Sequence, residues 1–231
     1  MAGAGDMGFV KGCGMARWSS IALLLAALAA AGCTPTDLTS ALSPDEAPKV
    51  AQAADHTVYA SRMDGDRMLP AIDAAKFDPA FLRARVPYET TEAPGTVVID
   101  TARRQLFFVE ADGWATRYGV AIGKEGFGWT GQGTIERNAR WPGWTPPPEM
   151  IARNPSLAKW KDGMPGGLDN PLGARALYIY FNGADSGFRI HGTNEPFSIG
   201  RSASSGCFRM LNQDVIDLYD RVAKGAKVVV I

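Results

Sequence analysis

Histidine and cysteine, the side chains that most often bind zinc or act as a base or a nucleophile, are scarce in this 231-residue chain, which has two histidines and three cysteines. Their positions give no clustered ligand set for zinc, so we expect neither a metal nor a cofactor. The 24 basic and 24 acidic side chains cancel, so nothing points to a nucleic-acid partner. The apolar content of 46% is ample for a globular core.

The apolar run near the N-terminus is too short to cross a bilayer, which needs about 20 residues. It covers residues 21–31, which is the length of a signal-peptide core. Directly after it, Ala-Ala-Gly-Cys at 30–33 resembles a bacterial lipobox. We therefore expect residues 1–33 to be an export signal and Cys33 to be lipidated. An ordinary signal peptide, cut near the alanines, is the alternative.

Cleavage of this signal would leave one thiol in the mature chain. Cys13 would leave with the signal, whether translation starts at Met1 or at Met15, and Cys33 would carry the lipid in a thioether. Cys207 would then have no second cysteine for a disulfide within the chain. A thiol retained in an exported protein indicates a reactive role.

The residues after the signal predict a tether and a weakly defined region. Residues 34–57 are rich in Thr, Ser, Pro, Ala and Asp, which favours a flexible tether in which His56 is solvated. Between 58 and 94 the clearest signal is Asp78-Pro79, a cap followed by proline at the first position of a short helical turn. We therefore divide the chain at residues 34 and 95.

From residue 95 on, short apolar runs separated by turn signals predict a mainly β domain. We expect strands at 96–100, 105–109, 114–120, 175–181, 188–191 and 227–231. Asn212 is a candidate cap for a helix at 213–223. The residues between 123 and 175 show little periodicity, which predicts a long irregular segment with a function of its own. Its four tryptophans suit stacking on a sugar or a peptide, or core packing: Trp129, Trp141, Trp144 and Trp160.

The chemistry is concentrated between His191 and Met210, in the run HGTNEPFSIGRSASSGCFRM. A thiol becomes a good nucleophile when a neighbour stabilises its thiolate, and an imidazole is the usual neighbour. Cys207 and His191 lie sixteen positions apart in this run. As an acid and base, the histidine could take the thiol proton and return it to a leaving amine. The run therefore predicts an acyl-transfer enzyme with a cysteine nucleophile.

The same residues resemble the L,D-transpeptidase (YkuD-type) catalytic domain, whose signature is HG[ST] followed by S-x-G-C-[aliphatic]-R-[ML]. The matching positions are His191-Gly192-Thr193 and Ser205 to Met210. Phe208 replaces the more common isoleucine or valine, which keeps the position apolar. The likeness covers about residues 95–231 and is closest to the periplasmic branch of Gram-negative bacteria. Two further segments carry that likeness: TPPPEMI at 145–151 and NPLGARALYIY at 170–180.

The resemblance implies a β-sandwich with a capping loop, with Cys207 as nucleophile and His191 held by the main-chain carbonyl of Gly192. From the chemistry alone, an imidazolium beside the sulfur would favour the thiolate. Main-chain N–H groups at Ser205, Gly206 and Cys207 are candidates for binding the oxyanion of the tetrahedral intermediate. The alternatives are a buried structural thiol for Cys207 and a plain turn residue for Ser205.

Three more residues are candidates for substrate contacts. Arg209 lies two residues past Cys207 and in an extended segment would face the same way. Its guanidinium could bind a substrate carboxylate with two hydrogen bonds. The alternative is an ion pair that braces the loop, with Asp214 as a candidate partner. Thr193 and Asn194 are the other two candidates.

In the family that the chain resembles, the cysteine attacks a tetrapeptide stem of peptidoglycan at its third residue and releases D-alanine. The acyl group then passes to an amine of another stem peptide or to a lysine of an outer-membrane lipoprotein. Water as the acceptor would make the enzyme a carboxypeptidase or a hydrolase, and the sequence leaves this choice open. We expect the protein to act in the periplasm, attached to a membrane by its lipid.

Two further classes compete with this interpretation. In a papain-like protease the cysteine precedes the histidine, whereas here His191 precedes Cys207. A non-catalytic lipoprotein that binds the cell wall is the other class, and it would have no need of both side chains.

Overall fold

Nine strands form one mixed sheet in the computed structural model, which describes residues 49–123, 129–204 and 206–231. The described residues belong to one unit, and the predicted signal and Cys33 lie outside them. The order across the sheet is β12-β10-β9-β8-β13-β4-β5-β6-β3. The strands are β3 (Ala84–Pro87), β4 (Val97–Asp100), β5 (Gln105–Val109), β6 (Trp114–Gly119), β8 (Gly131–Arg140), β9 (Arg175–Phe181), β10 (Ala184–His191), β12 (Phe208–Arg209) and β13 (Ala226–Val230).

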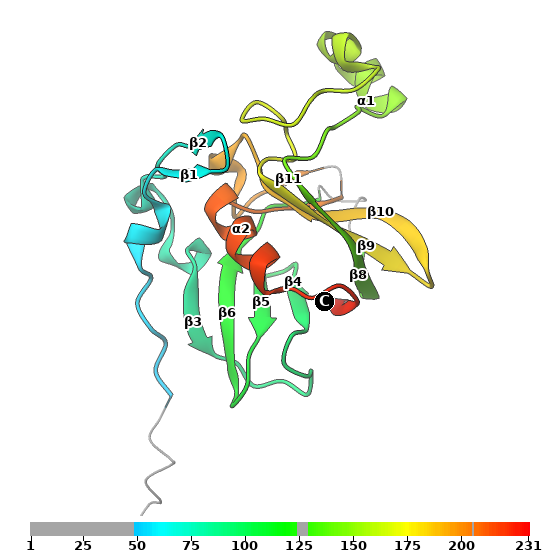
Figure 1. Ribbon diagram of the computed structural model, residues 1–231. Coiled ribbons are helices and arrows are strands. Elements are labelled where there is room, and N and C mark those ends of the chain that lie inside the picture. The colour runs from blue at the N-terminus through cyan, green and yellow to red at the C-terminus, as the bar shows by residue number, and fades with distance from the viewer. Residues whose placement is uncertain (1–48, 124–128, 205) are drawn as a thin grey trace, which may run out of the picture. The chain divides into compact units, whose positions relative to one another are not determined.

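The two halves of this sheet run in clearly different directions (Figure 1). Strands β4, β5 and β6 lie in one half and β8, β9 and β10 in the other, joined through β13. Buried side chains from both halves, such as Leu106 and Leu177, belong to the same core cluster, so the bent sheet encloses its core. The expectation of a mainly β fold that encloses its core like a sandwich is confirmed.

Helix α2 (Asn212–Arg221) covers one side of this core and packs against β9. Its buried residues include Val215, Ile216 and Leu218, which recur at helical spacing, as the sequence predicted. The other helical pieces are short: η2 (His56–Tyr59), η3 (Ala74–Lys76), η4 (Pro79–Phe81), α1 (Pro148–Arg153), η5 (Pro155–Trp160) and η6 (Pro196–Ser198). No helix of the described residues is long and apolar enough to cross a membrane.

The longest strand of the sheet, β8, was missed by the sequence analysis. β8 extends over ten residues in the stretch expected to be irregular, and only Ile135 within it is fully buried. Its sequence GQGTIERNAR shows no apolar alternation, so no local pattern predicted it. Main-chain pairing with β13 on one side and β9 on the other holds the strand in the sheet. Gly133 fits there because a Cβ would lie 2.7 Å from the main-chain oxygen of Tyr180. The irregular segment therefore begins after Arg140.

Residues 58–87 are more ordered than their sequence suggested. Two short antiparallel strands, β1 (Arg62–Asp64) and β2 (Arg67–Leu69), form a hairpin, and β3 adds an edge strand to the main sheet beside β6. The predicted turn at Asp78 is confirmed, since its carboxylate accepts a hydrogen bond from the N–H of Ala80 at 2.8 Å.

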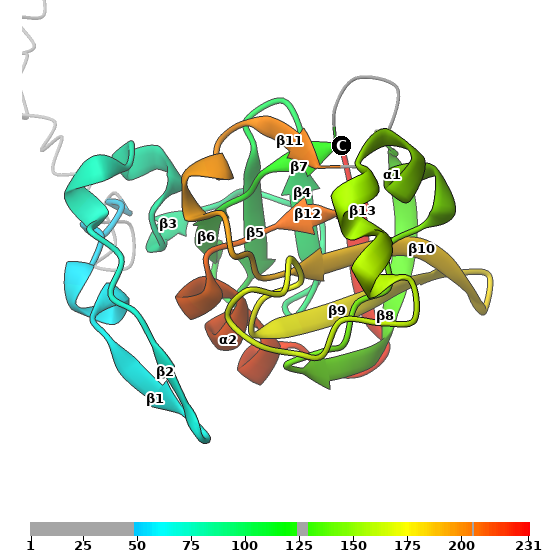
Figure 2. The ribbon, with the colours of Figure 1, turned by 90° about the horizontal axis from the view of Figure 1, so that it is seen from above.

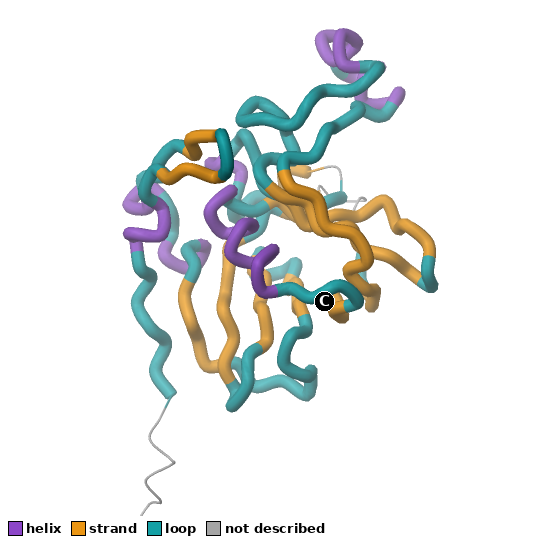
Figure 3. Tube along the Cα trace, viewed as in Figure 1, coloured by secondary structure: helices purple, strands orange, loops and turns teal. Residues whose placement is uncertain are grey.

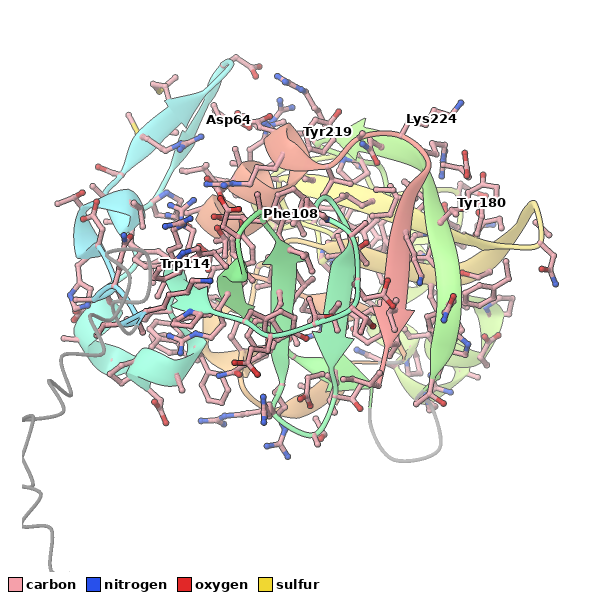
Figure 4. The ribbon with its side chains drawn as sticks, turned by 90° about the horizontal axis from the view of Figure 1, so that it is seen from below. Asp64, Phe108, Trp114, Tyr180, Tyr219 and Lys224 are labelled. Atoms are coloured by element: carbon pink, nitrogen blue, oxygen red, sulfur yellow. The ribbon has the colours of Figure 1, made fainter. Side chains whose placement is uncertain are left out.

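The hairpin is fixed by a buried ion pair. Asp64 accepts two hydrogen bonds of 2.7 Å from Arg175, which is 1% exposed, and a third of 2.8 Å from the indole of Trp141. The Arg175 guanidinium also lies over the ring of Tyr219, so it joins the hairpin to α2. Figure 4 labels Asp64 on the hairpin and Tyr219 on α2. These contacts connect residues about a hundred positions apart, which local sequence patterns do not record.

Candidate active site

The last residues of β10 and the short strand β12 form a parallel seam in which Ile190 pairs with Phe208 and His191 with Arg209. Paired residues of neighbouring strands point to the same face of a sheet, and successive residues alternate. Ile190 and Phe208 belong to the hydrophobic core, so His191 and Arg209 face the other way. Cys207 directly precedes Phe208, at the start of β12.

The His191 ring is buried, with 5% of the residue exposed, and its Nδ1 lies 2.6 Å from the main-chain oxygen of Gly192. A carbonyl can only accept, so Nδ1 carries the proton that it donates there. The other ring nitrogen, Nε2, then presents a lone pair. The resemblance implied this same carbonyl as the group that holds the ring.

Burial sets the charge state of both groups. It lowers the pKa of His191 to about 4, and the cations of Arg209 and Arg189 act in the same direction. Burial also raises the pKa of the Cys207 thiol, against a main-chain hydrogen bond from Arg189 and the two guanidinium groups. Both the thiol and the imidazole are therefore favoured in their neutral forms at rest. The sequence had led us to expect an imidazolium beside a thiolate.

The turn before Cys207 requires glycine at position 206, whose φ of 119° lies in the region that side chains rarely adopt. The Cys207 thiol is part-exposed and lies 3.8 Å from the main-chain oxygen of Gly187, in a bulge of β10. Ser205, the other predicted residue of this turn, lies outside the described residues.

Arg209 is held by an ion pair whose partner the sequence analysis missed. Its Nη1 lies 2.7 Å from Oε2 of Glu195, a side chain that is 66% exposed. The prediction that Asp214 would be this partner is wrong, because Asp214 is buried beside Arg83 and Tyr59. Glu195 could have been found, since it is the one acidic residue between His191 and Met210.

Thr193 and Asn194 are both close to this seam but face different surroundings. Thr193 is 3% exposed, and its hydroxyl accepts a hydrogen bond of 3.0 Å from the N–H of Glu195, which shapes the loop. Asn194 is exposed and donates to the main-chain oxygen of Asp169 at 2.9 Å. Asn194 therefore ties the end of β10 to the segment between β8 and β9.

A sequence model of the L,D-transpeptidase catalytic domain (YkuD) family matches residues 94–230. The chain belongs to this family. The probable L,D-transpeptidase ErfK/SrfK of Escherichia coli (strain K12) is 34% identical over 144 residues, which cover 58% of this chain and 43% of that protein. The probable L,D-transpeptidase YbiS of the same strain is 33% identical over 138 residues, which cover 57% of this chain and 43% of that protein. The chain thus spans less than half the length of these relatives.

A crystal structure from Brucella melitensis, described as a probable carnitine operon oxidoreductase caia, is 48% identical to the chain. The matched region covers 69% of this chain and 99% of the Brucella chain, with a TM-score of 0.47. The overlay is too loose to support an argument, and that description belongs to the other protein.

Asn212 is a residue of this L,D-transpeptidase domain whose role the sequence misassigned. It is the first residue of α2, not its cap, which is Leu211. Its Oδ1 accepts hydrogen bonds from the N–H groups of Ala174 and Thr193, and its Nδ2 donates to the oxygen of Thr193. A Cβ on Gly192 would lie 2.2 Å from that Oδ1, so the glycine of the His-Gly-Thr step is needed for this close packing.

Arg189 is a second residue that the sequence analysis left out. It lies two positions before His191 on β10 and pairs with Asp185 at 3.0 Å. Together with Arg209 it places two cations near the thiol. The alternation Arg-Ile-His in a predicted strand was a signal for it. No group of three or more His, Cys, Asp or Glu side chains is placed to hold a metal ion in the part of the chain that the structure describes.

Proposed function

We propose that the protein is a cysteine-dependent L,D-transpeptidase that acts on the tetrapeptide stems of peptidoglycan. The observation that supports the proposal is the seam of β10 and β12: His191 pairs with Arg209 at its end, and Cys207 directly precedes Phe208, so the two residues lie at the ends of neighbouring strands. The hydrogen bond from Nδ1 to Gly192 directs the basic Nε2 away from the main chain, as a general base requires.

The reaction needs two acyl transfers. The Cys207 thiol gives its proton to Nε2 of His191 while the sulfur attacks the carbonyl of the third residue of the stem. The oxyanion that forms accepts hydrogen bonds from main-chain N–H groups at Ser205, Gly206 and Cys207. When the carbon–nitrogen bond breaks, His191 returns the proton to the amine of D-alanine, which leaves, and a thioester remains.

The second transfer regenerates the thiol. An acceptor amine attacks the thioester and passes a proton to His191, which then protonates the departing sulfur. Because both side chains are favoured as neutral groups at rest, proton transfer and attack have to occur together. The acceptor is an amine of a second stem peptide or a lysine of an outer-membrane lipoprotein. Water in its place gives the alternative activity, an L,D-carboxypeptidase or hydrolase with the same site.

Arg209 is the proposed ligand of a substrate carboxylate. Its present partner, Glu195, is an exposed carboxylate held through a single short contact. A substrate carboxylate that forms two parallel hydrogen bonds with the guanidinium could replace it. Thr193 is buried and shapes the loop that places Glu195, whereas Asn194 is exposed beside that loop and is the better placed of the two for a substrate contact.

Purified protein incubated with a disaccharide-tetrapeptide, followed by mass spectrometry of the products, tests this function. We expect release of D-alanine and a cross-linked dimer, and trapping at short times should show a thioester adduct on the intact protein. Cys207→Ala provides the matched control and should form no adduct. Unchanged substrate with the wild-type protein, in the presence of acceptor, would reject the enzyme and favour a wall-binding lipoprotein.

The place of action is the periplasm, where we propose that a lipid on Cys33 attaches the chain to a membrane and the residues between Cys33 and Gln52 act as a tether. The expected tether, 34–57, was too long at its end: the N–H of Gln52 donates to the main-chain oxygen of Arg85 at 2.9 Å, and η2 begins at His56. Two acyl chains contribute about 0.8 kcal/mol per buried CH₂, which suffices for stable attachment. Cys33→Ala should release the protein or block signal cleavage, while the domain still reacts in vitro. Fractionation that finds the wild type wholly soluble, with another mature N-terminus, would contradict the anchor alone.

A further inference from the structure

Between β8 and β9 the chain leaves the sheet and carries α1 and η5, and we call residues 141–174 the capping segment (Figures 1 and 3). This segment contains a cleft of about 450 Å³. Small-molecule sites commonly measure about 300–1,000 Å³. The cleft is lined by Lys159, Trp160 and residues 164–170, and we call it the Trp160 cleft.

Trp160 differs from the other tryptophans in how its ring is used. Trp141 donates its indole N–H to Asp64, and the ring of Trp129 packs 4.1 Å from that of Phe181. The Trp160 ring is half-buried, its one ring contact among the described residues is Lys159 Nζ at 5.4 Å, and it belongs to none of their core clusters. The ring is thus fixed at the end of η5 without a role in the core.

The other residues that line the cleft, 164–170, are held by hydrogen bonds and leave open space at Gly167. The buried Asn170 donates to the oxygen of Pro165 at 3.0 Å and accepts from the N–H of Leu172 at 2.9 Å. Gly166 is packed against Trp141, whereas a Cβ built on Gly167 meets nothing within 4 Å. The exposed carboxylate of Asp169 and the exposed ammonium of Lys159 add hydrogen-bonding groups at the rim.

An aromatic face next to charged rim groups and open main chain suits a pyranose ring better than a peptide. The apolar C–H face of a sugar stacks on an indole ring, while its hydroxyl and acetamido groups need donors and acceptors around the edge. A peptide side chain would require a deeper apolar pocket, and Leu168 at 42% exposed does not provide one.

The Trp160 cleft is tied to the catalytic seam through Asp169. Its main-chain oxygen accepts the hydrogen bond from Asn194, which follows His191 by three residues. Three residues span at most about 10 Å. A tetrapeptide stem that is attacked at its third residue has three residues between its sugar and the reacting carbonyl, so it could follow this link from Asp169 toward His191.

We propose that the Trp160 cleft binds an amino-sugar ring of the glycan strand that carries the donor stem peptide. The proposal rests on the proposed function, because it supplies the other half of that substrate. The cleft would hold the sugar while its stem extends along Asn194 to Cys207.

The test compares two substrates, a disaccharide-tetrapeptide and the free tetrapeptide. Trp160→Ala should lower kcat/KM about tenfold for the first, the loss of one good contact, and leave the second within about twofold. Gly167→Leu, which fills the cleft at a position without positive φ, should give the same pattern. Trp114→Ala, on β6, is the matched control and should change neither value. Equal losses on both substrates, or no loss on either, would overturn the proposal.

A second measurement separates this proposal from the proposed function. A tetramer of N-acetylglucosamine, which has no stem peptide, is titrated into the full protein while tryptophan fluorescence is recorded. Saturable quenching that Trp160→Ala abolishes supports sugar binding, even if the wild type shows no turnover. Absence of quenching in the wild type would reject the cleft as a sugar site and leave the enzyme assignment untouched.

Discussion

Two buried parts of the molecule contain ionisable side chains and treat them differently. At the junction where the β1–β2 hairpin meets the sheet, the Arg175 cation is neutralised by a carboxylate, that of Asp64. In the catalytic seam, burial instead shifts the pKa values of His191 and Cys207 so that both groups are favoured as neutral. Charge pairing at the junction favours stability, whereas poised neutral groups in the seam favour proton transfer. Substitutions should therefore separate the two parts: the seam should lose rate, and the junction should lose stability.

The largest effect is expected from Cys207→Ser. A serine alkoxide is far harder to form than a thiolate beside one histidine, so turnover should fall below detection. The change in volume is small and the residue is part-exposed, so the melting temperature should stay near that of the wild type. Product formation from the stem peptide, followed by mass spectrometry, checks the first statement. Substantial residual transpeptidation would rule out Cys207 as the nucleophile.

His191→Ala should lower kcat by about 10²–10⁴-fold, the usual loss of an acid–base group. Because the pKa of His191 is lowered to about 4, the wild-type kcat/KM should keep its value down to weakly acidic pH and fall only near pH 4. This acidic limb should be absent from the profile of the variant. A wild-type limb near pH 6.5 would instead show that the imidazole behaves as an exposed one.

Asp64→Ala tests the junction. Removal of one partner of a buried ion pair leaves the other charge without compensation, at a loss of about 3–5 kcal/mol of unfolding free energy. The side chain of Arg175 is 2% exposed, so the Asp64–Arg175 pair counts as a buried ion pair. Urea denaturation measures the loss, with Asp66→Ala, in an exposed pair of the same hairpin, as the control. Activity per folded molecule should change little. A variant of normal stability and low activity would place the junction in the catalytic machinery.

Arg209→Lys should raise KM about tenfold with little change in stability, because an ammonium cannot reproduce two parallel hydrogen bonds to a carboxylate. Glu195→Gln should act in the opposite direction, since it removes the carboxylate that competes for Arg209. Steady-state kinetics of both variants on one tetrapeptide substrate give the comparison. If Arg209→Lys loses as much stability as activity, the arginine braces the loop and does not bind substrate.

The sequence predicted the seam better than the junction, and the reason is the range of the contacts. Strands such as 105–109 and 175–181 have local apolar patterns, and the structure forms them at those positions. β8 and the Asp64–Arg175 pair depend on partners that are distant in the chain, and they went unnoticed. Asn212 was assigned to a helix cap because caps are the commonest use of asparagine there, but its side chain bridges two loops. Short-range chemistry can be predicted from motifs, whereas long-range polar contacts require the fold.

The smallest effect is expected on the pH dependence of wild-type stability, where His191 of the seam and Asp214, a buried carboxyl of α2 beside Arg83, oppose each other. The pKa of His191 is lowered from 6.5 to about 4, so the unfolded chain binds the extra proton in that window and stability rises with pH. Burial raises the pKa of Asp214 from 3.8 to about 7, so the folded chain holds the extra proton and stability falls as pH rises.

Between about pH 4 and 6.5 these two contributions nearly cancel, so the wild-type unfolding free energy should vary little through these groups. His191→Ala removes one of them, and its stability should fall as pH rises through this window. Asp214→Asn removes the other, and its stability should rise with pH. Urea denaturation at a series of pH values measures all three proteins. Parallel curves for the two variants would mean that burial does not shift the pKa values of His191 and Asp214 in opposite directions.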